Sequence, residues 1–154
     1  MLTIKIANQK DMSNIQDLIN NHHLDEINLE AMADHCMIAY DNEIPVAAAG
    51  YESFGSIGIL RFVVVRRDRQ REYLGDGILK AVLNLADKKG IRRMIVGTQQ
   101  HGKFFKKVGF CKLNIQQHED EAIKTFIEKN FRQDVSLWEA MLPDFFQKSC
   151  RSNQ

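Results

Sequence analysis

The stretch of residues 60–89, LRFVVVRRDRQREYLGDGILKAVLNLADKK, constrains the fold of this chain more than any other. An apolar run ends at Val65 and gives way to a polar turn. Helical periodicity begins at Tyr73, with later apolar residues on one face. Two lysines and then Gly90 follow, as is typical of a helix C-terminus. The pattern therefore predicts a buried strand, a turn and a helix over residues 73–89.

A turn that leads from a buried strand into a helix is suited to binding an anion. The first four N–H groups of a helix have no partner within it, and the helix dipole favours negative charge at that end. Many such turns bind nothing, and surface arginines often do no more than interact with water, so a plain surface turn is the alternative. A phosphorylated ligand is favoured by four arginines around this turn: Arg66, Arg67, Arg69 and Arg71.

Composition limits the class of protein. With 154 residues, 44% of them hydrophobic and 27% charged, the chain is expected to form one soluble domain over residues 1–148, with a frayed tail at 149–154. No apolar stretch approaches the roughly 20 residues that span a bilayer. The N-terminus also lacks a signal-peptide pattern. We therefore expect a cytoplasmic protein without a membrane partner.

Three cysteines, Cys36, Cys111 and Cys150, are widely spaced and form no Cys-x-x-Cys pair. This pattern predicts reduced thiols rather than a disulfide framework or a structural metal site. The net charge of +1 provides no general attraction for nucleic acid. A nucleic-acid contact at residues 66–71 remains an alternative, but no aromatic side chains are interleaved with the arginines.

The remaining periodicity predicts alternating strands and helices. The unit over residues 57–97, strand–helix–strand, requires a crossover and parallel pairing, whereas hairpins imply antiparallel neighbours. We therefore expect an α/β fold with a central mixed, mostly antiparallel sheet and helices on both faces. The ligand crevice should lie at the C-terminal ends of the central strands. Strands are expected at residues 3–7, 37–40, 45–51, 57–65, 94–97, 111–115 and 135–142, and further helices at 28–34, 102–108 and 119–130.

Two local patterns complete the expected fold. A helix should begin at Asp11 or Ser13, and Ser13 with Gln16 fits a capping box. The last strand should return antiparallel beside residues 111–115 and close the sheet. Trp138 would then lie in the core, near an acceptor opening or at a subunit contact.

Two motifs, in this order and at this spacing, resemble the GNAT-type N-acetyltransferases, which bind acetyl-coenzyme A. After the strand that ends at Val65, residues 70–75 (QREYLG) stand at the family signature Gln/Arg-x-x-Gly-x-Gly/Ala, and an apolar pair follows. Residues 104–110 (FFKKVGF) match the second motif, an aromatic pair followed by Glu/Lys-Lys-x-Gly-Phe. The resemblance covers residues 3–115, whereas residues 116–154 match only as the place of a last strand. It implies a GNAT-like fold.

The resemblance also implies a reaction and its co-substrate. Acetyl-CoA would donate its acetyl group to a primary amine of a small molecule or a protein, by direct attack in a ternary complex and without a metal. The main chain of Val63, Val64 and Val65 would lie along the pantetheine arm. The other residues implied at the acetyl-CoA site are Gln70, Arg71, Glu72, Tyr73, Leu74, Gly75, Asp76 and Phe105.

Three residues depart from the family pattern. Tyr73 replaces the first motif glycine, and Arg67 replaces the usual proline. Phe105 stands where the family commonly has a tyrosine that protonates the leaving thiolate. Because phenylalanine has no proton to donate, a non-catalytic acyl-CoA-binding or regulatory module of the same fold is the alternative function.

A general base is needed because a typical amine is protonated at pH 7. Glu52, near the end of the second hairpin strand, is the first candidate, and His101, at the start of the second-motif helix, is the second. Each has a plain alternative as a solvated surface residue. Tyr51 or Cys111 could replace the missing acid, while the other histidines show no pairing: His22, His23, His35 and His118. The acceptor has no readable motif, and a homodimer is one possible assembly.

Overall fold

The computed structural model describes residues 1–22, 24, 27–70, 72–117 and 120–146. The chain divides into two compact units, Met1–Arg92 and Arg93–Gln154, which are described in turn. The single domain expected over residues 1–148 stays a prediction. The expected tail at 149–154 lies outside the described residues, as do His23, Arg71, His118, Glu119 and Cys150.

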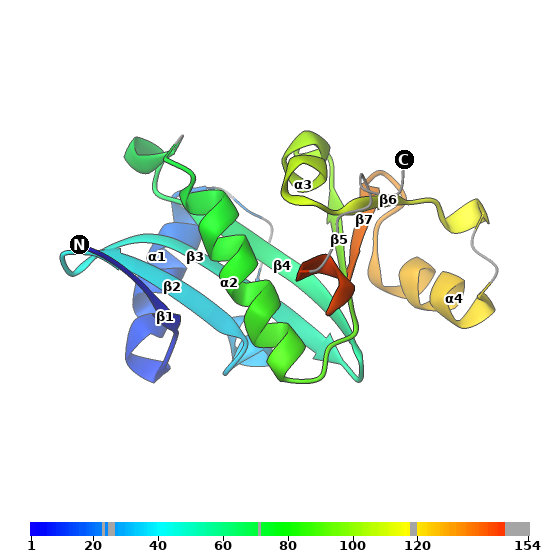
Figure 1. The fold of residues 1–154 in the computed structure, drawn as a ribbon, viewed down its shortest axis with the longest axis horizontal. Helices are drawn as coiled ribbons and strands as arrows, with labels where there is room; N and C mark the ends of the chain where they lie inside the picture. The colour runs from blue at the N-terminus through cyan, green and yellow to red at the C-terminus, as the bar shows by residue number, and fades with distance from the viewer. Residues whose placement is uncertain (23, 25–26, 71, 118–119, 147–154) are drawn as a thin grey trace. The chain divides into compact units, whose positions relative to one another are not determined.

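The first unit is built on four consecutive antiparallel strands: β1 (Leu2–Ile6), β2 (Cys36–Asp41), β3 (Ile44–Phe54) and β4 (Ile57–Val65) (Figure 1). The predicted turn between β2 and β3 is confirmed. Asn42 and Glu43 both have positive φ, 50° and 74°, as a two-residue hairpin turn of this hand requires. In the β3–β4 ladder, Ala47 lies opposite Val65 and Ala49 opposite Val63.

Two helices cover opposite faces of this sheet (Figure 1). The helix α1 (Met12–Asn20) buries Ile15, Leu18 and Ile19 against one face. The helix α2 (Leu74–Lys88) follows β4 and buries an apolar stripe that includes Ile78 and Val82. The apolar periodicity seen in the sequence is therefore confirmed for both helices, because the apolar residues form their buried faces.

Two predictions near α1 are wrong. A helix expected over residues 28–34 is only a short 3-10 turn, η2 (Leu29–Met32). The capping box does not form at Ser13, which lies inside α1, but one turn earlier at Asn8 and Asp11, around the 3-10 turn η1 (Gln9–Asp11). The chain folds around the Asp11 carboxylate because Lys5 and Tyr40 also bind it, and these long-range contacts are absent from the local pattern.

The second unit contains three antiparallel strands: β5 (Arg93–Thr98), β6 (Cys111–Leu113) and β7 (Ser136–Met141). The predicted antiparallel pairing of the last strand with residues near 111 is confirmed. The expectation that this strand closes the sheet is wrong, since β7 lies between β5 and β6: Trp138 is opposite Val96 on one side and Lys112 on the other. Trp138 is a core residue, 9% exposed, and packs against Gly102.

Two helices belong to the second unit, α3 (Gly102–Val108) and α4 (Glu121–Asn130). Gly109 ends α3 with a φ of 130°, a conformation that favours glycine. Asp120 caps α4 by accepting hydrogen bonds from the amides of Ala122 and Ile123. The strand expected over 111–115 is shorter, because a 3-10 turn, η4 (Ile115–Gln117), follows it. No helix within the described ranges is long and apolar enough to cross a membrane.

Candidate functional site

The main chain at the end of β4 presents hydrogen-bonding groups on the side away from β3. Arg66 N donates to Val46 O over 2.8 Å. In an antiparallel ladder, the N–H and C=O groups of alternate residues point toward the partner strand. Because those of Arg66 point toward β3, the N–H and C=O groups of Val63 and Val65 point away from β3. The Val64 side chain is buried in the core beneath α1. Val64 thus has a different environment from Val63 and Val65, a difference that the continuous apolar sequence does not indicate.

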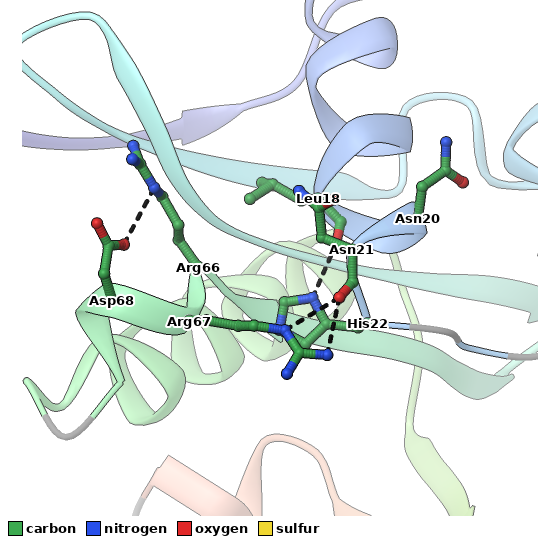
Figure 2. Close-up of a pocket in the computed structure, with 7 residues that line it drawn as sticks. All are labelled: Leu18, Asn20, Asn21, His22, Arg66, Arg67 and Asp68. Atoms are coloured by element: carbon green, nitrogen blue, oxygen red, sulfur yellow. Dashed lines mark hydrogen bonds and ion pairs between the residues drawn. The ribbon is translucent and has the colours of Figure 1, made fainter.

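The carbonyl oxygen of Val65 is in contact with two side chains of the protein. His22 Nε2 lies 2.7 Å from it, and Gln70 Nε2 donates to it over 3.3 Å. The other ring nitrogen of His22, Nδ1, lies 2.8 Å from Leu18 O (Figure 2). The turn that precedes α2 and the residues that follow α1 therefore both contact the residue that ends β4.

The N-terminus of α2 carries the predicted anion site. The helix begins at Leu74 and not at Tyr73, because Tyr73 has left-handed backbone angles, φ 62° and ψ 15°. Its side chain is 81% exposed and makes no capping hydrogen bond. Helix geometry leaves the amides of Leu74, Gly75 and Asp76 without a partner inside the helix. The Asp76 carboxylate pairs with Lys80 at 3.0 Å.

The described arginines of the turn all have partners within the protein. Arg66 pairs with Asp68 at 3.0 Å, and Arg67 donates twice to Asn21 O, at 3.1 and 3.0 Å. Arg69 bridges the carboxylates of Asp41 and Glu72, each at 2.9 Å, and together with the N-terminal ammonium it lowers the pKa of Asp41. Asp41 and Glu72 already offset the charge of Arg69, so the sequence pattern alone overstates the positive charge that a phosphate would meet.

A hollow of about 520 Å³ lies between the end of α1 and the turn after β4 (Figure 2). One wall comes from the last residues of α1 and the two that follow, and the other from the start of the turn. Six of the seven lining side chains are polar: two amides, an imidazole, two guanidinium groups and a carboxylate. The lining residues are Leu18, Asn20, Asn21, His22, Arg66, Arg67 and Asp68.

The two candidate bases occupy different units. Glu52, on β3, accepts hydrogen bonds from Arg61 Nε and Nη2, each at 3.0 Å, and its side chain is 28% exposed. Both contacts involve the same carboxylate oxygen, Oε1. His101 precedes α3 and is exposed, and its amide donates to Thr98 Oγ1 at 3.0 Å. Their roles as bases stay predictions.

Phe105 lies in an aromatic cluster within the second unit. It is 6% exposed, and its ring centroid is 5.2 Å from that of Phe104 and 5.3 Å from that of Phe110. Phe145 extends the cluster at 6.0 Å from Phe110. The ring therefore has a packing role in the second unit, and its implied contact with acetyl-CoA stays a prediction.

Tyr51 and Cys111, the two residues considered as proton donors in place of the family's tyrosine, differ in solvent exposure. Tyr51 is fully buried and stacks on His35 at 4.6 Å. Burial raises the pKa of Tyr51 to about 12, so its hydroxyl retains its proton. Cys36 is likewise buried, and burial raises the pKa of its thiol to about 12, whereas Cys111 is partly exposed. Across the described ranges, no three His, Cys, Asp or Glu side chains gather as ligands for a metal ion.

His22 is the residue of this region that sequence reasoning missed. It lies 43 residues from Val65, and neither its neighbours nor its spacing indicate the contact. Proximity to the end of a predicted helix was the single available signal. Only the fold brings His22, Gln70 and Val65 together.

Comparison with known proteins identifies the family of the chain. Residues 7–110 match the family described as "Acetyltransferase (GNAT) family". No curated protein sequence matches the chain significantly. The family match contains β4, the turn and α2, so the candidate site lies within the matched segment.

Solved structures show the same fold. N-acetylglutamate synthase from Neisseria gonorrhoeae, complexed with coenzyme A and N-acetyl-glutamate, has a TM-score of 0.76 at 19% identity over 92% of this chain. The chain spans 35% of the length of that synthase. The sequence-predicted GNAT-like fold is confirmed by this likeness.

Two further structures are of similar length to this chain. Rv2747 from Mycobacterium tuberculosis, in complex with CoA, has a TM-score of 0.70 at 17% identity, over 91% of this chain and 99% of its own. The ribosomal-protein-S18-alanine N-acetyltransferase from Escherichia coli has a TM-score of 0.70 at 14% identity, over 92% and 94%. At such identities the likeness concerns the fold.

Proposed function

The chain belongs to the GNAT acetyltransferase family, and we propose that it transfers the acetyl group of acetyl-CoA to a primary amine of a small molecule or a protein. The single observation that carries this proposal is the arrangement of residues 63–76. Main-chain groups of β4 that face away from β3 lead directly into the unpaired amides at the start of α2. This order suits a ligand with an extended amide-containing arm and a pyrophosphate.

Each part of this segment would hold a different part of the ligand. The main chain of Val63 and Val65 would pair with the amides of the pantetheine arm. The amides of Leu74, Gly75 and Asp76 would bind the pyrophosphate, because unpaired N–H groups and the helix dipole both favour negative charge there. Tyr73 leaves this end accessible, since its side chain points into solvent.

In the proposed reaction the neutral amine attacks the thioester carbon. A C–N bond forms, the C–S bond breaks, and the thiolate leaves with a proton supplied from solvent or from a side chain. The enzyme would contribute positioning and an N–H donor for the developing oxyanion. Glu52 and His101 are the proposed bases that take the amine proton.

A non-catalytic acyl-CoA-binding module is the second candidate function, and Phe105 favours it. The residue cannot donate a proton, and its ring is fully engaged with Phe104 and Phe110. A positioned acid typically contributes roughly 10²–10⁴-fold to a rate. The lack of one would slow an acetyltransferase without abolishing its activity, so the two candidates differ in a measurable way.

The test is release of CoA from acetyl-CoA in the presence of a panel of primary amines. The panel contains free amino acids, polyamines and peptides with free N-termini, and CoA is separated from acetyl-CoA by chromatography. Enzyme-dependent and amine-dependent CoA release supports the transferase. Tight acetyl-CoA binding without release by any amine supports the binding module instead.

A further inference from the structure

One contact expected of the acyl arm is already made by the protein itself. The Val65 carbonyl, which faces away from β3, accepts from His22 Nε2 at 2.7 Å and from Gln70 Nε2 at 3.3 Å. A carbonyl oxygen has two lone pairs, and these two donors occupy both. An amide N–H of a pantetheine arm that approached this oxygen would have to displace one of them.

His22 makes the shorter of the two contacts. Its distance of 2.7 Å is at the short end of the usual range for N–H···O hydrogen bonds, whereas the 3.3 Å of Gln70 lies beyond that range. The ring is also fixed at its other nitrogen, which lies 2.8 Å from Leu18 O. In the tautomer that carries its proton on Nε2, the ring donates to Val65 O.

The hollow beside this contact offers the ring another position. His22 is part of the wall of the 520 Å³ space, which Asn20 and Asp68 also line (Figure 2). Arg67 holds the adjacent backbone by two hydrogen bonds to Asn21 O. Rotation of the ring into this space would leave the end of α1 attached to the turn through Arg67.

We propose that His22 is a latch on the acyl-arm site: its imidazole occupies the Val65 carbonyl in the free protein and must rotate into the adjacent hollow before acetyl-CoA binds. This inference rests on the proposed function, since it assumes that the main chain of β4 receives the arm. The latch reduces the apparent affinity for the ligand by the fraction of molecules in which the carbonyl is open.

Calorimetric titration with CoA tests the latch in four proteins: wild type, His22→Ala, His22→Gln and Asn20→Ala. His22→Ala should bind CoA about threefold to tenfold more tightly, the range that one net hydrogen bond supports. His22→Gln keeps a side-chain N–H for Val65 and should stay close to wild type. Asn20→Ala is the matched control, because Asn20 lines the same hollow without contacting Val65.

A second ligand separates the arm from the phosphates. Adenosine 3′,5′-bisphosphate carries phosphates and adenine but no pantetheine, so its affinity should be the same for wild type and His22→Ala. Equal or weaker CoA binding by His22→Ala, with wild-type binding intact, overturns the latch and leaves the proposed function standing. Failure of all four proteins to bind CoA overturns both.

Nuclear magnetic resonance of the wild-type protein covers the case in which His22→Ala does not fold. The ring resonances of His22 should shift when CoA is added and should not shift with adenosine 3′,5′-bisphosphate. Ring resonances that stay unchanged at saturating CoA overturn the latch, because the imidazole would then have kept its contact with Val65.

Discussion

The Tyr40 hydroxyl donates a hydrogen bond of 2.7 Å to Asp11 Oδ1, joining β2 to the start of α1. The other carboxylate oxygen accepts from Lys5 Nζ at 2.7 Å and from the Asn8 amide at 2.8 Å. Asp11 is only 6% exposed, so these donors replace the water that a buried carboxylate would otherwise need. The network fixes where α1 begins.

Replacing Asp11 should therefore destabilise the fold. Asp11→Asn keeps the shape but leaves the Lys5 ammonium without its carboxylate, and we expect a loss of about 2–4 kcal/mol in the free energy of unfolding. Urea denaturation measures this loss, with Lys10→Ala as an exposed control that should change it by less than about 0.5 kcal/mol. A similar small change for Asp11→Asn would show that the network adds little.

The same network predicts an acid dependence of stability. Burial alone would raise the pKa of Asp11, but the hydrogen bonds from Lys5, Asn8 and Tyr40 outweigh burial and lower it from the ordinary value of 3.8. A depressed folded-state pKa contributes stability that is complete above the ordinary value and is lost as pH falls through the lowered one. Wild type should lose more stability than Asp11→Asn between pH 5 and pH 2, as measured by urea midpoints.

Gly75→Glu should weaken acetyl-CoA binding by about tenfold or more, because it adds bulk and negative charge beside the amides proposed for the pyrophosphate. Gly75 lies in the first turn of α2. Calorimetry measures the change, with Asn84→Glu as the control, since it adds the same charge to an exposed position of the same helix. Equal affinities for the two variants would place the phosphates elsewhere.

Phe105→Tyr should leave the turnover of acetyl-CoA unchanged or raise it, because the new hydroxyl could protonate the thiolate if the ring faces the sulfur. Steady-state kinetics measures turnover, and thermal unfolding reports the cost of placing a hydroxyl in the aromatic cluster. Phe110→Tyr is the control: Phe110 is fully buried, so its variant should lower stability without raising turnover. A large loss of turnover by a folded Phe105→Tyr would mean that the position serves packing alone.

Removing β7 should abolish the fold of the second unit. This strand lies between β5 and β6, so a chain ending at Asn130 loses both ladders and exposes the apolar surface that Trp138 covers. Differential scanning calorimetry should show loss of cooperative melting for this variant, while a chain lacking only residues 149–154 keeps it. A soluble, cooperatively melting chain without β7 would show that the strand is an appendage.

Local patterns predicted the parts of this fold that local physics controls. The periodicity of residues 74–88 reflects the stripe that α2 buries, and the positive φ of Asn42 and Glu43 matches the expected turn. The start of α2 was placed one residue early, because nothing in a tyrosine signals a left-handed backbone such as that of Tyr73.

Contacts between distant segments escaped sequence reasoning for a different reason. His22 meets Val65 across 43 residues, and Arg69 finds Asp41 across 28. The sequence shows four arginines at the turn but not the carboxylates that pair with Arg66 and Arg69. A count of arginines therefore overestimates the positive charge available to a ligand. The position of β7 between β5 and β6 likewise depends on strand pairing, which residue alternation does not specify.

Titration calorimetry of the wild-type protein with acetyl-CoA and with CoA tests the central claim most directly. The arrangement of the β4 main chain and the α2 N-terminus predicts saturable binding of both ligands with one site per chain. Absence of binding heat and of any thermal shift at millimolar acetyl-CoA would contradict the account.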